Sequence, residues 1–150
     1  LILDSLKGAD VDLIGGLEIG AVPLAVAVAV TSQIKGWPLR AFFVRKQAKT
    51  YGTARLAEGA DITGRRVCVV EDVITTGGST RECIGALTAN GGNVVAAASI
   101  IDRSNGAANV GVPRISLVSL DVPSYKPDVC PMCAAGVEAV KPGSRTVTAK

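Results

Sequence analysis

The sequence predicts an α/β fold in which helices flank a doubly wound, mostly parallel sheet, as a single domain over residues 1–150. Two observations lead to this fold class. Short aliphatic runs of strand length alternate with longer segments of helical character, an order typical of parallel strands joined by crossover helices. Hydrophobic residues make up 48% of the chain and aromatic residues 3%, which suits a sheet whose two faces are buried by aliphatic side chains.

The first third of the chain supplies a helix end, a strand and a second helix. Leu1–Lys7 has the character of a helix end, and because the chain starts there without a methionine, a truncated N-terminus is one interpretation. Val11–Ile14 is expected to be a short strand, and Gly15–Gly20 is expected to be the turn that follows it. Pro23 suits the first turn of a helix that continues to about Ser32.

Further strands are expected on both sides of an irregular segment. Leu39–Val44, Val94–Ile101 and Arg114–Leu120 have the length and aliphatic character of strands. Arg45–Thr63 differs from them, because it is polar, rich in basic residues and without an amphipathic period. A segment of this length without regular structure is usually functional or disordered. The tail from Pro123 is rich in Pro and Gly, and the sequence does not specify its fold.

The stretch Val67–Asn90 carries the strongest functional signal in the chain. It opens with an aliphatic run, Val67–Val70, which predicts a buried parallel strand. Two acids, Glu71 and Asp72, follow where that strand is expected to end. After a short loop, Ser79 opens an S-x-x-E sequence with the spacing of a capping box, which predicts the start of a helix.

The loop between the acids and the helix has the composition of a phosphate site. Gly77 and Gly78 lack a Cβ, so backbone N–H groups can come close to an anion there. The helix start adds unpaired N–H groups and the positive end of the helix dipole. A phosphate fits such a cradle without needing a lysine. Hydroxyl donors are expected from Thr75, Thr76, Ser79 and Thr80.

The two acids need a different partner from the glycine loop. Glu71 and Asp72 would repel a phosphate, so we expect them to bind sugar hydroxyls or Mg²⁺ on the same ligand. The alternative is an ordinary strand-to-helix turn with a capped helix and two solvated acids. That alternative explains Ser79 but leaves the acid pair and the glycine loop unexplained. We therefore predict a site for a phosphorylated ligand that carries hydroxyl groups.

Four chemically suggestive clusters directly follow predicted strands. In parallel sheets of this class, ligands bind beyond the carboxyl ends of the strands. Since these ends share one edge of the sheet, the four clusters are expected to lie together and to form one site. The clusters are Gly15–Gly20, Arg45–Lys49, Glu71–Ser79 and Asp102-Arg103.

The composition excludes several classes of function. The chain has no histidine, which excludes Ser–His and Cys–His catalysis and any metal site with a histidine ligand. The net charge of +3 is too mild to indicate a nucleic-acid partner. No secretory signal is visible, and the apolar run Ala21–Val30 is too short to span a membrane. We therefore predict a cytoplasmic protein without a membrane or nucleic-acid partner.

The four cysteines fall into two groups. Cys68 and Cys83 lie on the predicted central strand and helix, where they are expected to be small buried residues. Cys130 and Cys133 form a C-x-x-C sequence in the tail, and the chain has no second C-x-x-C or histidine to complete a zinc site. We expect two reduced cysteines in a turn, with a metal shared across a dimer as the alternative.

The motifs at the strand ends resemble those of a known family. Glu71–Ser79, EDVITTGGS, resembles the PRPP-binding signature of type I phosphoribosyltransferases. Phe43–Gly52, FVRKQAKTYG, is similar to the mobile loop of the orotate phosphoribosyltransferases within that superfamily. Gly15–Ala25, GGLEIGAVPLA, and Ile100–Gly106, IIDRSNG, resemble the same family's pyrophosphate-side turn and Asp-Arg strand end. The PRPP signature indicates only the superfamily, whereas the mobile loop and the Asp-Arg end indicate orotate as the base.

The resemblance implies a role for each cluster. Glu71 and Asp72 would hold the ribose 2- and 3-hydroxyls, and Asp72 would also be a catalytic residue. The residues that would bind the 5-phosphate are Thr75, Thr76, Gly77, Gly78 and Ser79. The pyrophosphate side would include Gly16 and Glu18. The alternative for Glu18 is an ordinary acid at a helix N-terminus. The pyrophosphate itself would meet Arg45, Lys46 and the catalytic loop lysine, Lys49.

The base and the remaining partners follow from the same resemblance. Arg103 would pair with the orotate carboxylate, where the alternative is a surface ion pair between Asp102 and Arg103. Mg²⁺ would bind mainly through PRPP, and no separate protein metal site is expected. The resemblance implies a homodimer in which the loop Arg45–Thr63 reaches the neighbouring site.

The activity implied is transfer of the phosphoribosyl group from PRPP to orotate, giving orotidine 5-phosphate and pyrophosphate in pyrimidine (UMP) biosynthesis. The alternatives are a salvage phosphoribosyltransferase for another nucleobase and a non-catalytic regulator that senses PRPP. Two features depart from the family pattern. Tyr51 stands where the family commonly has a loop histidine, and almost none of the family's N-terminal hood, which covers the orotate ring, is present before Val11.

Overall fold

The computed structural model of the chain contains the strands and helices that the sequence predicts, in the predicted order, and adds a short strand within Arg45–Thr63 and two short helices in the tail from Pro123. The structure describes residues 1–46, 57–123 and 125–137. Its strands are β1 (Leu13–Leu17), β2 (Arg40–Val44), β3 (Ala57–Gly59), β4 (Arg66–Ile74), β5 (Asn93–Asp102) and β6 (Arg114–Ser119). Its helices are α1 (Ile2–Ser5), α2 (Ala21–Ile34), α3 (Gly78–Ala89) and α4 (Pro131–Ala134), with the 3-10 helix η1 (Pro127–Val129) before α4.

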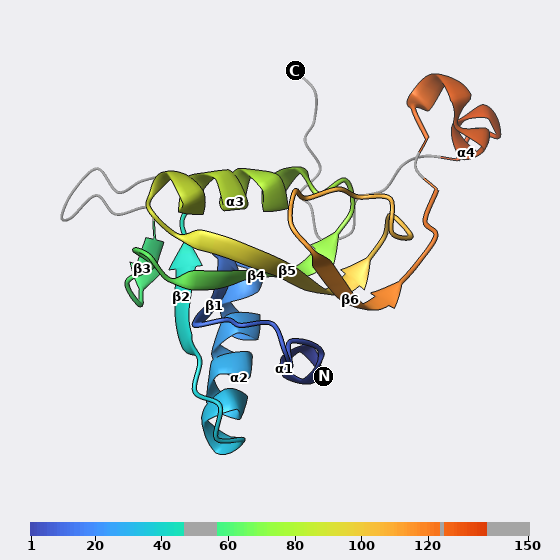
Figure 1. Cartoon of the computed structure of the whole chain (residues 1–150). Coiled ribbons are helices and arrows are strands. Elements are labelled where there is room, and N and C mark those ends of the chain that lie inside the picture. The colour runs from blue at the N-terminus through green and yellow to red at the C-terminus, as the bar shows by residue number, and fades with distance from the viewer. Residues whose placement is uncertain (47–56, 124, 138–150) are drawn as a thin grey trace.

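The described strands form one sheet in the order β3-β2-β1-β4-β5-β6 (Figure 1). All neighbouring strands are parallel except β3, which is antiparallel to β2. Helix α3 covers one face of the sheet, while α1 and α2 lie on the other face (Figure 1). The predicted fold class, a doubly wound and mostly parallel sheet flanked by helices, is therefore confirmed.

The side chains of β4 alternate between two hydrophobic cores. Cys68 and Val70 pack in the core beneath α2, whereas Val67 and Val69 pack in the core beneath α3. All four side chains are fully buried, which accounts for the continuous aliphatic run in the sequence. Burial of a side chain of this size stabilises the fold by about 1.5–3 kcal/mol. The two cores hold the carboxyl end of β4 in a fixed position between the helices.

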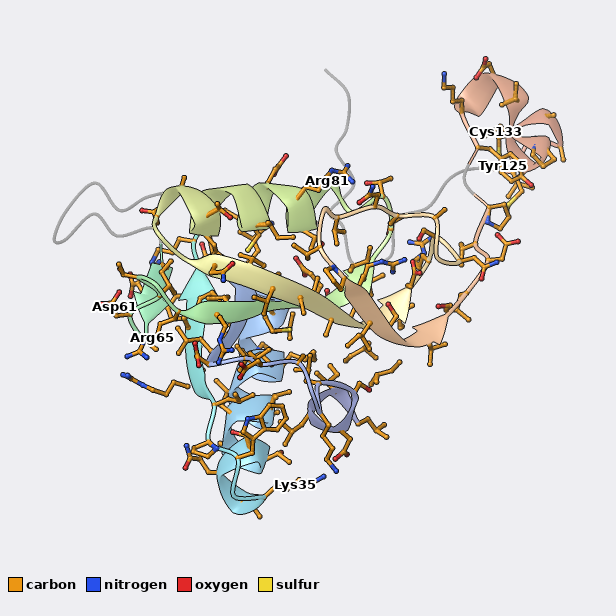
Figure 2. The ribbon with its side chains drawn as sticks, viewed as in Figure 1. Lys35, Asp61, Arg65, Arg81, Tyr125 and Cys133 are labelled. Atoms are coloured by element: carbon orange, nitrogen blue, oxygen red, sulfur yellow. The ribbon has the colours of Figure 1, made fainter. Side chains whose placement is uncertain are left out.

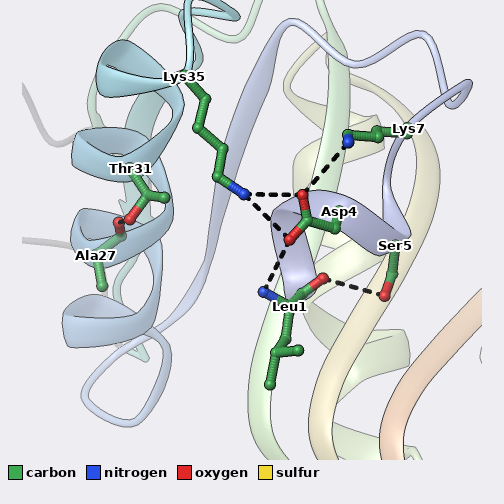
Figure 3. A network of polar contacts seen from close by, with 7 residues as sticks. All are labelled: Leu1, Asp4, Ser5, Lys7, Ala27, Thr31 and Lys35. Carbon is green, nitrogen blue, oxygen red and sulfur yellow. Dashed lines mark hydrogen bonds and ion pairs between the residues drawn. The ribbon is translucent and has the colours of Figure 1, made fainter.

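Helix α1 is joined to the end of α2 by exposed polar contacts (Figure 3). Lys35 Nζ donates to both carboxylate oxygens of Asp4, at 2.9 and 3.1 Å. The hydrogen bond from Lys35 lowers the pKa of Asp4 to about 2. Because the pair is solvent-exposed, it adds little to stability, and α1 is held mainly by the buried residues Ile2, Leu3 and Leu6.

The strand β1 corrects the first predicted turn. Gly15 and Gly16 lie inside β1, paired with Phe42 and Phe43 of β2, and the turn is confined to residues 18–20, after the end of β1. A Cβ at Gly15 would overlap the carbonyl oxygen of Phe42, and a Cβ at Gly16 would overlap that of Val70. These glycines are therefore required by close approach of the neighbouring strands, and their role as a turn was predicted wrongly.

The strand β4 is longer than predicted. It continues past Val70 to Ile74, because β5 pairs with it as far as Ile74 opposite Asp102. Glu71 and Asp72 consequently lie within the strand and not after its end. Consecutive strand residues point to opposite faces of a sheet, so the two acids are directed to different sides.

Helix α3 starts earlier than the predicted capping box. Its N-cap is Gly77, with φ of +74°, and no side chain caps the helix, so Ser79 lies in the first turn. This left-handed conformation favours glycine, and a side chain at Gly77 would also lie 2.9 Å from Val110. At its other end, α3 stops at two glycines: the N–H groups of Gly91 and Gly92 donate to the carbonyls of Thr88 and Leu87, as in a Schellman motif.

The segment expected to be irregular, Arg45–Thr63, contains the edge strand β3. Residues 47–56, which include Lys49 and Tyr51, lie outside the described residues. Beyond β6, η1 and α4 pack on each other and extend away from the sheet (Figure 1). Among the described residues, no helix has the length and apolar character needed to cross a membrane.

Candidate active site

The parallel strands bring the predicted clusters to one edge of the sheet. β1, β2, β4 and β5 run in the same direction, so their carboxyl ends and the start of α3 lie together. The end of β1 contributes Glu18, the end of β2 contributes Arg45 and Lys46, and β4 contributes Glu71 and Asp72. The prediction that these residues share one edge is therefore confirmed by the strand pairing.

The ends of β1 and β2 are joined by contacts between an acid and basic residues. The backbone N–H of Lys46 donates to Glu18 Oε1 at 3.1 Å. The guanidinium of Arg45 lies 3.9 Å from Glu18 Oε2, and its Nε donates to Glu58 Oε1 at 2.7 Å. Glu18 thus orients the first residues of the basic segment, a function beyond that of a helix N-terminal acid. Arg45 is held over the ring of Phe43, 5.6 Å from its centroid.

Glu71 is the buried acid of the site. It is 8% exposed and points to the α3 side, where burial and then the charge of Glu71 raise the pKa of Cys83. Burial and then the neighbouring charge of Asp72 raise the pKa of Glu71 to about 7, while the ammonium group of Lys46 acts in the opposite direction. Among the described residues, none donates a hydrogen bond to Glu71. A protein carboxylate in this state can accept hydrogen bonds from a ligand.

Asp72 faces the other side of the sheet, next to the turn after β1. Its Oδ1 accepts a hydrogen bond from the N–H of Val73 at 2.8 Å, and the side chain is exposed. A Cβ built at Gly20 would lie 2.9 Å from Asp72 Oδ2, so the backbone of this turn passes close to the carboxylate. The two acids therefore contact different walls of the site, a separation that the sequence did not indicate.

The phosphate loop combines exposed hydroxyl groups with a fixed backbone. Thr75, Thr76 and Ser79 are exposed, whereas Thr80 is buried, so its prediction as a hydroxyl donor to the ligand was wrong. The N–H of Gly78 donates to Thr76 Oγ1 at 3.4 Å. Between them, Gly77 is buried in its left-handed conformation. The loop thus leaves the helix start and the hydroxyl groups accessible to an anion.

Arg81 is a site residue that the sequence did not identify. Its Nη1 donates to the carbonyl oxygens of Thr76, at 3.1 Å, and Asn109, at 2.6 Å. It therefore joins the phosphate loop to the segment after β5, and Figure 2 shows it at the N-terminal end of α3. In the sequence it is one polar residue in a predicted first helical turn, and nothing there indicates the contact 28 residues away.

Asp102, at the end of β5, organises the turn that carries Arg103. It is 1% exposed and accepts hydrogen bonds from the N–H and Oγ of Ser104, at 2.8 and 2.6 Å, and from the N–H of Gly106, at 2.8 Å. Arg114 lies 2.8 Å away. Burial raises the pKa of Asp102, but the bonds from Ser104, Arg114 and Gly106 outweigh it and hold the pKa well below its usual range.

The geometry of this turn corrects one alternative. The ion-pair partner of Asp102 is Arg114 on β6, and not the adjacent Arg103. The backbone N–H of Arg103 is bonded to Ile74 O at 2.8 Å, while its side chain is exposed. Arg103 is therefore available to a ligand at the same edge as the phosphate loop.

A groove of about 440 Å³ lies between the strand ends and α3. Its lining includes Lys46 from the end of β2, Ser79 from the phosphate loop and Leu17 from the end of β1. The volume falls within the range of small-molecule sites in proteins. The described part of the chain thus provides an accessible groove beside the basic strand end and the start of α3, although Glu71, Asp72 and Arg103 are not among its lining residues.

The donor set at this edge can be tested against Mg²⁺. The described residues hold no group of three or more acids, cysteines or histidines that could hold a metal ion. Mg²⁺ in phosphate-binding enzymes commonly uses one or two carboxylates and completes its shell with ligand oxygens and water. Glu71 and Asp72 face opposite sides of β4, so one of these carboxylates, and not the pair, fits this arrangement. The prediction of a metal held mainly by the ligand is consistent with the donor set.

The comparisons with known proteins agree on one family, although no family model matches the chain. An orotate phosphoribosyltransferase of Carboxydothermus hydrogenoformans is 43% identical over 137 residues, which cover 91% of this chain and 68% of that protein. One from Thermotoga maritima is 43% identical over 141 residues, covering 93% of this chain and 71% of that protein.

Solved structures extend the likeness to the fold. The Mycobacterium tuberculosis orotate phosphoribosyltransferase in complex with PRPP superposes with a TM-score of 0.67 at 37% identity, covering 78% of this chain and 68% of that one. The Saccharomyces cerevisiae adenine phosphoribosyltransferase, at 22% identity and a TM-score of 0.59, shares the fold alone. The chain belongs to the orotate phosphoribosyltransferase family.

Proposed function

We propose that the chain, as a single phosphoribosyltransferase domain, transfers the phosphoribosyl group of PRPP to orotate. The products are orotidine 5-phosphate and pyrophosphate, in the pathway of pyrimidine biosynthesis. The observation that carries this proposal is the shared edge of the sheet, where the phosphate loop, two acids and a basic strand end meet in a chain 43% identical to orotate phosphoribosyltransferases.

The ribose 5-phosphate would bind at the start of α3. Gly77 and Gly78 bring the backbone close to the anion, while Thr75, Thr76 and Ser79 supply hydroxyl donors. Glu71 and Asp72 would accept hydrogen bonds from the ribose 2- and 3-hydroxyls. The raised pKa of Glu71 supports this role, because hydroxyl donors would stabilise its charged form on binding.

Departure of pyrophosphate places positive charge on the ribose ring and negative charge on the leaving group. Lys46 and Arg45, together with Lys49 from the part of the chain outside the described residues, would stabilise the leaving pyrophosphate. Gly16 and Glu18 would form the wall of the pyrophosphate side, since Glu18 already orients the N–H of Lys46. Asp72 would lie beside the developing positive charge.

Mg²⁺ would bind with PRPP and be held by ligand oxygens and the carboxylates of Glu71 or Asp72. When bound, it neutralises part of the negative charge on the pyrophosphate. The protein's own contribution is to orient the sugar and exclude water from the reacting carbon. The basic side chains of this segment would stabilise the leaving pyrophosphate only after PRPP has bound.

Arg103 would pair with the orotate carboxylate. A guanidinium presents two parallel N–H donors to a planar carboxylate, which gives orotate an advantage over neutral bases. The turn that carries Arg103 is fixed by Asp102 and Arg114, so the cation would be positioned before the base arrives. This arrangement favours the orotate specificity over a neutral nucleobase in salvage.

A homodimer would cover the exposed face of α2. The helix has no charged residue over Ala21–Ile34, yet Val26, Val30 and Ile34 are 51%, 55% and 81% exposed. A helix that is apolar on all sides is usually buried. A second copy would bury this face, and the segment Arg45–Thr63 would then reach the neighbouring site.

The cytoplasmic location stays a prediction.

The proposed function is tested by measuring orotate consumption with PRPP and Mg²⁺, with uracil and adenine as competing bases. We expect orotate to be consumed with release of pyrophosphate, and Arg103→Ala to raise the KM for orotate much more than the KM for PRPP. Lys49→Ala is expected to lower kcat far more than PRPP affinity. Turnover of uracil or adenine without orotate would exclude the proposal in favour of salvage, and PRPP binding without turnover of any base would favour a regulator.

A further inference from the structure

The C-terminal lobe, formed by η1 and α4, contains a cysteine pair that the proposed reaction does not use. Cys130 is half-buried and Cys133 is exposed, and neither forms a disulfide. The lobe extends from the sheet, and Figure 2 shows Cys133 on it, away from Arg81 at the phosphate loop. In contrast, Cys68 and Cys83 are buried in the two cores. The two pairs differ in their access to reagents in solution.

The backbone holds Cys130 and Cys133 in one turn. Cys130 precedes the first residue of α4, Pro131, and its carbonyl accepts the N–H of Ala134 at 3.0 Å. Residues three apart on one turn have Cβ atoms about 5–6 Å apart, whereas a disulfide requires about 3.5–4.5 Å. Bond formation therefore needs a slight tightening of this exposed turn together with a change of side-chain rotamers. Pro131 restricts the backbone between them, because its ring fixes φ.

The neighbouring groups give the two thiols different acidities. Hydrogen bonds from the backbone N–H and then the thiol of Cys133 lower the pKa of Cys130. The side chain of Cys130, in turn, raises the pKa of Cys133. Burial raises the pKa of Cys68 and of Cys83 to about 12. Since the thiolate is the reactive form, Cys130 is the nucleophile of the four and Cys133 is placed to attack next.

We propose that Cys130 and Cys133 form a reversible dithiol–disulfide site that exchanges with low-molecular-weight disulfides. The Cys130 thiolate attacks one sulfur of the small disulfide, which forms a mixed disulfide and releases one thiolate. Cys133 then loses its proton to solvent, and its sulfur attacks the Cys130 sulfur and releases the second thiolate. The cysteine pair loses two electrons, the small disulfide gains them, and the released thiolates take up protons from water.

A metal site fits the same residues less well. The described residues contain no third acid, cysteine or histidine close enough to complete a set of ligands around the pair. Two sulfurs alone leave a tetrahedral Zn²⁺ incomplete, so a second copy of the lobe would have to supply the rest. Disulfide exchange requires only the two sulfurs that one chain holds in one turn.

The test equilibrates the full chain with defined ratios of oxidised to reduced dithiothreitol, followed by acid quenching, alkylation and mass spectrometry. We expect the peptide spanning Cys130 and Cys133 to lose two hydrogen atoms as the ratio rises and to regain them on reduction. Cys68 and Cys83 are expected to be alkylated only after unfolding. Cys130→Ser is expected to abolish the oxidation, and Cys68→Ser is the matched control that keeps it.

The kinetics separate the two cysteines. With glutathione disulfide, Cys133→Ser is expected to stop at a mixed disulfide on Cys130, whereas Cys130→Ser reacts at least tenfold more slowly. Thiols that stay reduced in excess oxidant, or disulfides that form only between chains, overturn the proposal. Uptake of one Zn²⁺ per two chains, with loss of alkylation at both residues, overturns it in favour of a shared metal site.

Discussion

Two neighbouring strands each carry a buried acid, Glu71 within β4 and Asp102 at the end of β5, and the protein surrounds the two carboxylates in opposite ways. Asp102 of β5 accepts bonds from Ser104 and Gly106 and pairs with Arg114, which hold its pKa well below the usual range. Glu71 of β4 has no hydrogen-bond donor among the described residues, and burial raises its pKa to about 7. The first acid is fully satisfied by the protein, whereas the second is left for a ligand. The comparison separates a structural acid from a binding acid without reference to the reaction.

The largest effect is expected from removal of the structural acid. Asp102→Ala leaves Arg114 charged and largely buried without its partner, so we expect a loss of about 3–5 kcal/mol in the free energy of unfolding, measured with urea at pH 7. Asp128→Ala is the matched control on an exposed acid, with an expected change within about 0.5 kcal/mol. Equal losses in the two variants would contradict the structural role of Asp102.

The pH dependence of stability distinguishes the two acids further. The folded pKa of Asp102 is depressed, so its contribution is present above the ordinary value of about 4 and is lost as the pH falls through the folded pKa. The folded pKa of Glu71 is raised, so its effect has the opposite sign: stability is higher below pH 4.5 and falls as the pH rises to about 7. Between pH 4.5 and 7, the free energy of unfolding of the wild-type chain is therefore expected to fall by about 2 kcal/mol because of Glu71. Glu71→Gln should not show this decrease when urea unfolding is measured at each pH. A wild-type profile that runs parallel to the Gln variant in this window would exclude the raised pKa.

A smaller effect is expected at the phosphate loop that follows Glu71. Gly77→Ala forces a side chain into a left-handed position beside Val110, so we expect a loss of about 1–2 kcal/mol in unfolding free energy. Gly78→Ala is the matched control, because Gly78 has a helical backbone and its nearest contact would be 3.6 Å away. The control should change stability by less than about 1 kcal/mol. Similar losses in both variants would mean that the backbone of Gly77 does not determine the loop.

The smallest effect is expected at the link between the two strand ends. Arg81→Met removes the donor that joins Thr76 O to Asn109 O, so the phosphate loop is expected to bind PRPP several-fold more weakly, as measured by calorimetry. Arg65→Met, an exposed arginine at the other end of the sheet, is the control for loss of one charge. If both variants bind PRPP equally, the link has no part in shaping the loop.

The sequence predicted the features that depend on local pattern. The aliphatic runs around Val67–Val70 and Val94–Ile101 predicted buried parallel strands, and the parallel direction placed the clusters at one edge. The glycine-rich loop predicted a tight approach at Gly77, although it misplaced the helix start. Gly15 and Gly16 were assigned to a turn, because a sequence does not distinguish a glycine required by a turn from one required by a neighbouring strand.

Long-range partners were beyond the sequence. Asp102 and Arg114 form an ion pair because β5 and β6 pair in a particular register. In the sequence, the adjacent Arg103 was the ion-pair partner considered for Asp102. Arg81 reaches Asn109 across a loop whose path no local pattern encodes. Such contacts determine which acid is satisfied and which is left for a ligand, so the contrast between Asp102 and Glu71 required the structure.

The number of protons released on PRPP binding tests most directly whether Glu71, unlike Asp102, is an acid that binds the ligand. Calorimetric titration at pH 6.5 in buffers of different ionisation enthalpy measures the number of protons released when PRPP and Mg²⁺ bind. If the Glu71 carboxylate accepts hydrogen bonds from the ribose hydroxyls, the pKa of Glu71 falls on binding. The wild-type chain should then release more protons than the Glu71→Gln variant. Equal proton release by the two proteins, with equal PRPP affinity, would contradict a role for Glu71 in ligand binding.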